Sequence, residues 1–289
     1  MSRLIDQWPT PAKVRPVKVI VASPSRSGTL GLYSAMQILG FRPYHLYECI
    51  LVHGLSHMRV FKEAIIAQYN RMSGVKRYTR PDFEKWIGDY DCLVEIPSYL
   101  GKNIFEAYAN DPEVKFILTE RRPDSWARSL NNSAGGVVAL SSQFPFNILK
   151  HFDATLHEFL EVNCMVYSAL SGCTKPGDPD NEKELISYYD DIKMAKETIP
   201  ADRLCIIKLE EGLGWEQICP FLGLPIPEEE YPDRNGPERF KRIVENFLKP
   251  HMLAATLRLG AVTLPALGVL GWASMKYGPS LLATLNSSL

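Results

Sequence analysis

The stretch Val17–Leu39, VKVIVASPSRSGTLGLYSAMQIL, decides the fold of this chain. Its first part, Lys18–Val21, is short and β-branched, which is typical of a buried parallel strand. From Thr29 onward, apolar residues recur at helical spacing until Gly40, where a helix is expected to end. The sequence therefore predicts a strand, a tight turn and a helix, the first unit of an α/β domain.

The turn, Ser25–Thr29, has the composition of an anion-binding loop. Small residues let backbone N–H groups approach an anion, and the dipole of the following helix favours negative charge. Arg26, Ser27 and Thr29 add a positive charge and two hydroxyl donors. The turn therefore predicts a phosphate or sulfate site, although an ordinary strand-to-helix turn with a surface arginine is the alternative for this segment alone.

Two familiar nucleotide-binding loops do not fit these residues. A Walker A loop ends in Gly-Lys-Ser/Thr, whereas Thr29 directly follows Gly28 here. A dinucleotide fingerprint needs three glycines, and this turn has only Gly28 and Gly31. Neither ATP hydrolysis nor NAD binding is supported.

Composition sets broad limits on the function. The chain has 289 residues, 46% of them hydrophobic, and a net charge of −1, so no global field attracts nucleic acid. Its six cysteines are far apart and form no C-x-x-C pair, which favours reduced thiols. The polar N-terminal arm, residues 1–16, lacks the apolar core of a secretory signal. A cytoplasmic protein is expected.

Two more predicted strands end in residues suited to a site. The strand Asp91–Ile96 contains Glu95 near its carboxyl end, where ligands bind in open parallel sheets. A carboxylate there can act as a general base, and a solvated or ion-paired glutamate is the alternative. The strand Lys115–Glu120 leads to Arg121, and Ser129 follows on a predicted helix. Arg121 and Ser129 can converge on one phosphate.

The second half of the chain is predicted to be mainly helical. Helices are expected over Phe144–Leu170 and Glu182–Thr198, a further strand over Leu204–Leu209, and a short helix over Trp215–Leu222.

The residues 253–289 form a predicted apolar tail. Leu259–Met275 contains 17 residues without a charge, near the short limit for a spanning helix, with Pro265 inside. Five basic residues precede it, which favours a cytosolic body anchored to an intracellular membrane: Arg239, Lys241, Arg242, Lys249 and Arg258. The alternatives are a buried core helix or a cap over a substrate channel.

Several motifs resemble those of the sulfotransferases. Pro24–Thr29 is similar to their 5′-phosphosulfate loop, P-K-S-G-T or P-R-T-G-T, and Arg121 with Ser129 to their 3′-phosphate motif. Leu118–Trp126, LTERRPDSW, is close to the L-T-x-R-x-P-E-S-W of a branch found in fungi and some animals. Fungal members of that branch are sometimes labelled NAD-dependent epimerases, a label these residues do not support.

Two further stretches match the same branch. Gly88–Pro97 resembles its G-D-Y-D followed by D-x-P, and Lys208–Pro227 resembles its K-x-G-W-E-P-L-C-x-F-L-G-x-P-x-P. The resemblance implies one P-loop-like α/β domain over residues 17–252, with a parallel sheet flanked by helices, that binds 3′-phosphoadenosine 5′-phosphosulfate (PAPS). The residues that it implies for PAPS binding are Arg26, Ser27, Gly28, Thr29, Arg121 and Ser129.

The chain departs from the family pattern at catalytic positions. Arg26 stands where the family has a lysine that stabilises the bridging oxygen, and it keeps the charge but cannot give up a proton. Glu95 occupies the Asp position of the branch and is the first candidate base; His45, His53 and His57 are weaker candidates. Arg122 replaces the usual acid after Arg121, which adds positive charge.

No metal site is expected. His53 and His57 are four residues apart and could share a helix face, as metal ligands do. The segment lacks the glutamate of a zincin motif, and no third ligand is placed by spacing.

These observations predict a sulfotransferase-like enzyme that uses PAPS to modify a hydroxyl of a small apolar acceptor, such as a secondary metabolite or lipid. A second hypothesis keeps the fold for a PAPS-independent biosynthetic step, such as a dehydration or cyclisation. A third is a membrane-tethered scaffold without activity.

Overall fold

The computed structural model describes residues 2–191, 193–232 and 237–286. Its centre is a parallel sheet of five strands in the order β2-β3-β1-β4-β5. The strands are β1 Val19–Val21, β2 Pro43–Tyr44, β3 Cys92–Val94, β4 Lys115–Glu120 and β5 Leu204–Lys208.

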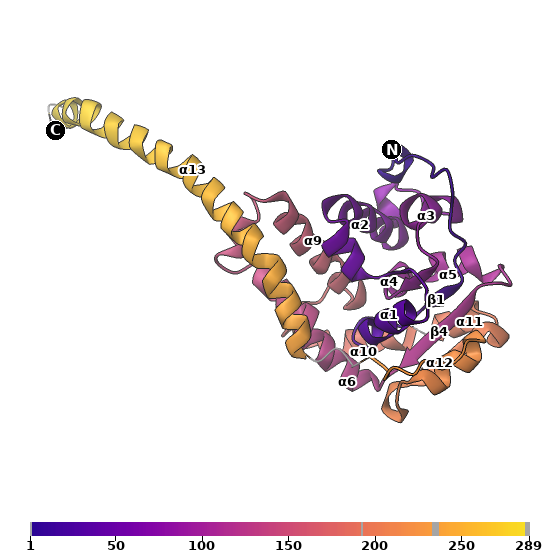
Figure 1. Cartoon of the computed structure of the whole chain (residues 1–289). Helices are drawn as coiled ribbons and strands as arrows, with labels where there is room; N and C mark the ends of the chain where they lie inside the picture. The colour runs from indigo at the N-terminus through magenta and orange to yellow at the C-terminus, as the bar shows by residue number, and fades with distance from the viewer. Residues whose placement is uncertain (1, 192, 233–236, 287–289) are drawn as a thin grey trace.

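Helices surround this sheet (Figure 1). In the first half they are α1 Thr29–Ile38, α2 Leu55–Tyr69, α3 Arg80–Ile87, α4 Ile96–Leu100, α5 Lys102–Ala109 and α6 Pro123–Leu130. In the second half they are α7 Gly136–Ser141, α8 Phe146–Leu149, α9 Ala154–Leu170, α10 Asn181–Asp191, α11 Lys193–Thr198, α12 Trp215–Leu222 and α13 Pro237–Asn286. Single π-helical turns, η2 Glu48–Val52 and η4 Asn131–Gly135, precede α2 and α7.

The sheet separates two hydrophobic cores because successive strand residues point to opposite faces. Ile20 of β1 belongs to the larger core, whereas Val19 and Val21 belong to the smaller one. The smaller core is closed by α1 and α12, through Leu32 and Ile218 among others. The larger core holds side chains from most of the remaining helices. The prediction of a parallel α/β sheet flanked by helices is confirmed.

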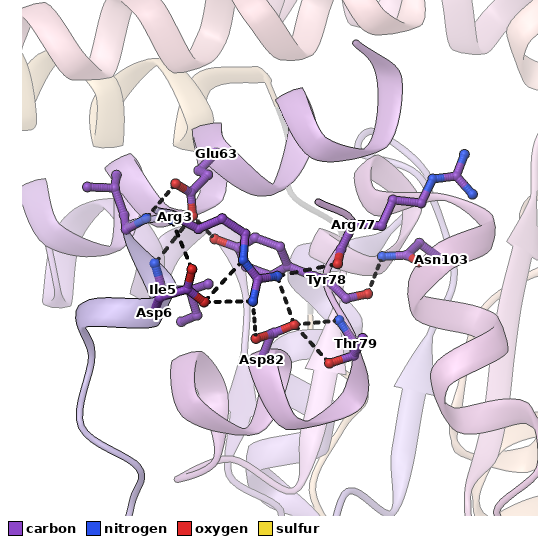
Figure 2. Close-up of polar contacts among 10 residues, drawn as sticks. Arg3, Ile5, Asp6, Glu63, Arg77, Tyr78, Thr79, Asp82 and Asn103 are labelled. Atoms are coloured by element: carbon purple, nitrogen blue, oxygen red, sulfur yellow. Dashed lines mark hydrogen bonds and ion pairs between the residues drawn. The ribbon is translucent and has the colours of Figure 1, made fainter. Parts of the chain in front are cut away.

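The N-terminal segment is fixed to the body by buried and polar contacts (Figure 2). The side chain of Ile5 is fully buried, and the backbone N–H groups of Leu4 and Ile5 donate to the carboxylate of Glu63. The guanidinium of Arg3 forms two hydrogen bonds with Asp82, at 2.9 and 3.0 Å. These contacts tie the first residues to α2 and α3.

The structure differs from the predicted elements at several places. The predicted strand Asp91–Ile96 is shorter, because β3 ends at Val94 and Ile96 begins α4. The two-residue strand β2 was not predicted, because its segment is aromatic and basic without a clear period. The prediction of one helix over Phe144–Leu170 is wrong. The backbone of Asp153 is extended, and its carboxylate accepts the N–H of Leu156 at 2.8 Å, so Asp153 caps the start of a separate helix, α9.

The tail forms the outer part of α13, a single helix of 50 residues that continues through Pro265. Its first turns lie against the body, and the rest projects away from it (Figure 1). Lys241–Tyr277 is long and apolar enough to cross a membrane, and its most apolar window is almost entirely exposed. The alternative of a buried core helix is therefore wrong for Leu259–Tyr277. Residues 287–289 lie outside the described part of the chain.

Candidate active site

The predicted site residues follow the carboxyl ends of neighbouring strands. The loop with Arg26 follows β1, His45 directly follows β2, Glu95 directly follows β3, and Arg121 directly follows β4. In a parallel sheet these ends lie at one edge, which is where open α/β sheets bind ligands. The fold therefore brings together residues that are up to 95 positions apart in sequence.

The loop after β1 is fixed by side chains of β4, of α6 and of Arg121 between them. The indole N–H of Trp126 donates to the carbonyl of Ser25 at 2.8 Å. The hydroxyl of Thr119 donates to the carbonyl of Ser27, and Arg121 Nη1 donates to the carbonyl of Arg26 at 2.9 Å. These bonds hold three successive carbonyl groups of the loop. The first N–H groups of α1 have no partner within the helix, so they are suited to an anion.

Both the backbone conformation and the space around position 28 favour glycine. The φ of Gly28 is +84°, in the left-handed region that side chains disfavour. A Cβ atom at this position would lie 3.0 Å from Leu213 Cδ2 and 3.2 Å from Leu209 Cδ1. The backbone of Arg26 is also left-handed, with φ +68°. Non-glycine residues in this region store strain that is common at functional sites.

The two predicted anion motifs meet directly. Arg26 Nε donates to the hydroxyl of Ser129 at 3.3 Å, and Arg121 contacts the same loop. Burial lowers the pKa of Arg26, and the positive charge of Arg121 lowers it further, while the carboxylate of Glu95 opposes both effects. Two guanidinium groups near one hydroxyl create a local excess of positive charge, which a multivalent anion would neutralise.

Five of the six predicted PAPS-binding residues line one cavity of about 570 Å³: Arg26, Gly28, Thr29, Arg121 and Ser129. The sixth, Ser27, is fully buried beneath the cavity rather than on its surface. Its N–H donates to the carbonyl of Pro24 at 3.2 Å, and its hydroxyl has no hydrogen-bond partner in the described part of the chain. A direct ligand contact by Ser27 stays a prediction.

The candidate base Glu95 lies in the same cavity, beside His45. Glu95 Oε2 is 2.5 Å from His45 Nε2, and Glu95 Oε1 accepts the hydroxyl of Tyr99 at 3.0 Å. Burial alone would raise the pKa of Glu95. The electrostatic interaction with His45 and hydrogen bonds from His45, Ser25 and Tyr99 outweigh burial and lower it. Glu95 also has a left-handed backbone, with φ +67°.

His45 has a defined orientation. Its Nδ1 accepts the backbone N–H of Tyr47 at 3.0 Å, so the ring proton lies on Nε2, which faces Glu95. The backbone N–H of His45 donates to Glu48 Oε2 at 3.1 Å. The family resemblance makes Glu95 the first candidate base, and the short strand β2, which places His45 beside it, was not predicted. Thr119 and Trp126 belong to the motif Leu118–Trp126, which predicts no role for them, and both fix the anion loop.

The other two candidate histidines do not line this cavity. The rings of His53 and His57 stack at 3.7 Å. Burial lowers the pKa of His57 to about 3, so it is neutral. Its Nδ1 accepts the indole N–H of Trp86 at 3.2 Å. In residues 2–191, 193–232 and 237–286, no group of three His, Cys, Asp or Glu side chains could hold a metal ion.

The cavity combines a polar end with an apolar wall. The polar end holds the residues described above, and aliphatic and aromatic side chains from η2, α9 and α13 form the wall: Ile50, Leu51, Phe159, Val162, Val166, Ile243 and Phe247. A second cavity of about 1050 Å³ adjoins the first and shares Arg26, Arg121 and Ser129 with it. The arrangement can therefore hold an anionic group beside an apolar molecule.

Comparison with known proteins identifies the family of this chain. The family model described as "Sulfotransferase domain" matches residues 18–240. The chain is 29% identical over 219 residues to the Ava biosynthesis cluster protein M of Aspergillus versicolor, covering 75% of this chain and 80% of that protein. A crystal structure of a sulfotransferase from Alicyclobacillus acidocaldarius aligns with a TM-score of 0.41 and 13% identity, over 86% of this chain and 96% of that one. With the family model covering most of its length, this chain belongs to the sulfotransferase domain family.

Proposed function

We propose that this protein is a PAPS-dependent sulfotransferase that acts on a hydroxyl group of a small apolar acceptor. The observation that carries the proposal is the convergence of Arg26, Arg121 and Ser129 beside the first turn of α1. The cavity presents mainly hydrogen-bond donors at this end and apolar side chains at the other. Such a cavity fits an anionic cosubstrate and an apolar acceptor side by side.

The residues on the cavity surface have distinct roles in this proposal. Arg121 and Ser129 bind the 3′-phosphate, and Gly28 and Thr29 bind the 5′-phosphosulfate through the start of α1. Arg26 remains protonated, because a guanidinium does not lose its proton even when burial lowers its pKa. It therefore stabilises negative charge on the bridging oxygen and cannot act as an acid.

Glu95, held in place by His45, is the candidate proton acceptor. PAPS supplies an activated sulfuryl group: its bridging S–O bond breaks while a new S–O bond forms to the acceptor oxygen, which loses its proton. Glu95 is ionised at neutral pH because its pKa is lowered, and His45 Nε2 faces it at 2.5 Å. His45 orients the carboxylate of Glu95, and that carboxylate can accept the proton of an acceptor hydroxyl.

The test is isothermal titration of the full chain with 3′-phosphoadenosine 5′-phosphate. We expect binding that weakens by about 10- to 100-fold in Arg26→Ala and in Arg121→Ala, since a lost charge-assisted hydrogen bond is worth about 1.5–3 kcal/mol. Lys102→Ala is the matched control, because Lys102 lies on α5 and pairs with Glu106 away from the cavity. Absence of binding to folded wild-type protein would overturn the proposal.

A PAPS-independent biosynthetic step is the second candidate. The observation that favours it is the buried His45–Glu95 pair, an acid–base couple that needs no cosubstrate. The relative from Aspergillus versicolor is named as a biosynthesis cluster protein, which is compatible with either reaction. Product formation without PAPS that persists in Arg26→Ala would favour this second function.

We also propose that the outer part of α13 anchors the protein to an intracellular membrane with its body on the cytoplasmic side. Leu259–Met275 has no charge, and at about 1.5 Å per residue it extends about 25 Å, close to the thickness of a bilayer core. Lys241, Lys249 and Arg258 precede it on the side of the body, as cytoplasmic flanks require.

A further inference from the structure

Glu48 is a buried carboxylate outside both cavities. It is 7% exposed and belongs to the lining of neither cavity. Burial raises its pKa, and the hydrogen bond from Tyr33 and the nearby His45 reduce this effect without cancelling it. A carboxylate that is costly to bury, and that contacts neither cavity, acts through the groups to which it is bonded. Those groups are the backbone of His45 and the hydroxyl of Tyr33.

The bond to His45 closes a reciprocal cap at the start of a helical segment. Residues 46 and 47 are helical, and η2 follows directly, beginning at Glu48. The carbonyl of His45 accepts the N–H of Cys49 at 3.1 Å, and its Nδ1 accepts the N–H of Tyr47 at 3.0 Å. In return, Glu48 Oε2 accepts the backbone N–H of His45 at 3.1 Å, as in a capping box. These three bonds fix both the backbone and the ring of His45.

The bond to Tyr33 connects this segment to the helix that follows the anion loop. Tyr33 lies on α1, four residues after Thr29 and so about 6 Å further along the helix. Its hydroxyl donates to Glu48 Oε1 and accepts Gln37 Nε2 at 2.9 Å. Burial and the adjacent Glu48 raise the pKa of Tyr33, so the hydroxyl keeps its proton at neutral pH. The ring of Tyr33 also packs against the ring of His45, with centroids 5.4 Å apart.

Glu48 thereby connects three parts of the candidate site. Through Tyr33 it reaches α1, whose first turn faces the anion site. Through His45 it reaches Glu95, because His45 Nε2 lies 2.5 Å from Glu95 Oε2. Glu48 is also the first residue of η2, which contributes Ile50 and Leu51 to the apolar wall of the first cavity. Group transfer between two bound molecules requires parts of this kind to keep a fixed separation.

We infer that Glu48 is a positioning residue, which holds His45, and through it the carboxylate of Glu95, at a fixed place relative to the start of α1. The inference rests on the proposed function, in which α1 binds the phosphosulfate and Glu95 accepts the proton of the acceptor hydroxyl. Glu48 itself touches neither reactant, since it lies outside both cavities. Its carboxylate suits this role because its two oxygens accept from two donors at once, one on each side.

The test is a mutant cycle that measures how strongly His45 and Glu95 stabilise each other. Urea unfolding of the full chain in detergent micelles compares wild type, His45→Leu, Glu95→Leu and the double variant, which gives the coupling between the two side chains. The same four proteins are then compared with Glu48→Leu added to each. A general loss of stability from Glu48→Leu cancels within the cycle, so a change in coupling reports positioning. We expect the coupling to fall by about half or more.

Three further variants make this test specific. Glu48→Gln keeps an oxygen that accepts the N–H of His45, so it should retain the coupling that Glu48→Leu loses. Tyr33→Phe removes a single hydroxyl and should lower the coupling as well, and it carries the test if Glu48→Leu does not fold. Glu158→Leu is the matched control, because Glu158 is another buried glutamate outside both cavities and pairs with Lys62 instead. It should leave the coupling unchanged.

Titration with 3′-phosphoadenosine 5′-phosphate separates this inference from the proposed function. Normal nucleotide binding, with the same His45–Glu95 coupling in wild type, Glu48→Leu and Tyr33→Phe, would overturn the positioning role and leave the sulfotransferase proposal standing. Reduced coupling in these variants, without nucleotide binding by folded wild-type protein, would overturn the sulfotransferase proposal. Glu48 would then position the same pair for the PAPS-independent function.

Discussion

Single residues of the anion loop show how conformation and contact combine. Arg26, Glu95 and Gly28 all have left-handed backbones, and all three line the cavity. Such conformations cost about 1–3 kcal/mol each and persist only where surrounding bonds impose them. Trp126 and Arg121 bind the loop around Arg26, and His45 and Tyr99 hold Glu95, so the strain and its restraint lie in the same site.

Gly28→Ala tests whether contacts with neighbouring side chains add to the backbone cost at this position. Gly40→Ala is the matched control. Both glycines have φ +84°, but a Cβ at Gly40 meets no atom within 4 Å, whereas one at Gly28 meets Leu213 and Leu209. We expect a loss of about 1 kcal/mol for Gly40→Ala from the backbone alone, and about 2–4 kcal/mol for Gly28→Ala. Urea unfolding measures both. Equal losses would show that the leucine contacts do not constrain the loop.

Glu95 gives a pH-dependent prediction. Its pKa lies below the ordinary value of 4.5, so the charged form stabilises the folded state. That contribution is complete above about pH 5 and is lost as the pH falls through the folded pKa. The difference in unfolding free energy between wild type and Glu95→Gln should therefore be constant from about pH 5 to 8 and shrink below it. Glu106→Gln, on the surface of α5, should show no such change, and a difference that grows below pH 5 would contradict the sign.

At the scale of elements, one aspartate connects α9 with α13. Asp153 caps α9 through the N–H of Leu156 and pairs with Arg258 and His251 of α13. Burial would raise the pKa of Asp153, but these partners outweigh burial and lower it. The orientation of the long helix thus depends on a residue whose local function is to begin another helix.

Two substitutions at Asp153 separate its role as the cap of α9 from its ion pairs with α13. Asp153→Asn keeps a good helix cap and loses the charge, so we expect a stability loss of about 1 kcal/mol. Asp153→Ala loses the cap as well, and about 2 kcal/mol should be lost. Thermal unfolding measures both, and Arg258→Ala should match Asp153→Asn. Identical results for Asn and Ala would mean that the cap contributes nothing.

At the scale of the whole molecule, an α/β body carries a long apolar helix that also lines its cavity. Leu264, Leu267 and Leu270 are 70%, 63% and 66% exposed, so their side chains have little contact with the body. Changing all three to lysine should leave folding intact and abolish membrane retention, because each charge costs about 3 kcal/mol at the centre of a bilayer. Carbonate washing of cell membranes measures retention. A triple variant that stays in the membrane pellet would exclude α13 as the anchor.

Much of the fold could be predicted from sequence because the decisive signals are local. The β-branched run before Pro24, the apolar spacing after Thr29 and the apolar strand Lys115–Glu120 depend on neighbouring residues only. β4 begins and ends where it was predicted, and α12 matches its predicted range. The helix prediction failed at Asp153, where a capping residue interrupts a continuous apolar pattern.

The sequence by itself determined the strand, loop and helix around Arg26, the second anion motif at Arg121 and Ser129, and the family to which both belong. Only the tertiary structure decided that His45 faces Glu95, that Ser27 lies beneath the cavity, and that α13 lines it. The physical reason is the distance along the sequence over which the interactions act. Strand and loop signals arise from a few adjacent side chains, whereas β2, the His45–Glu95 pair and the cavity wall formed by α13 exist only after distant segments pack together.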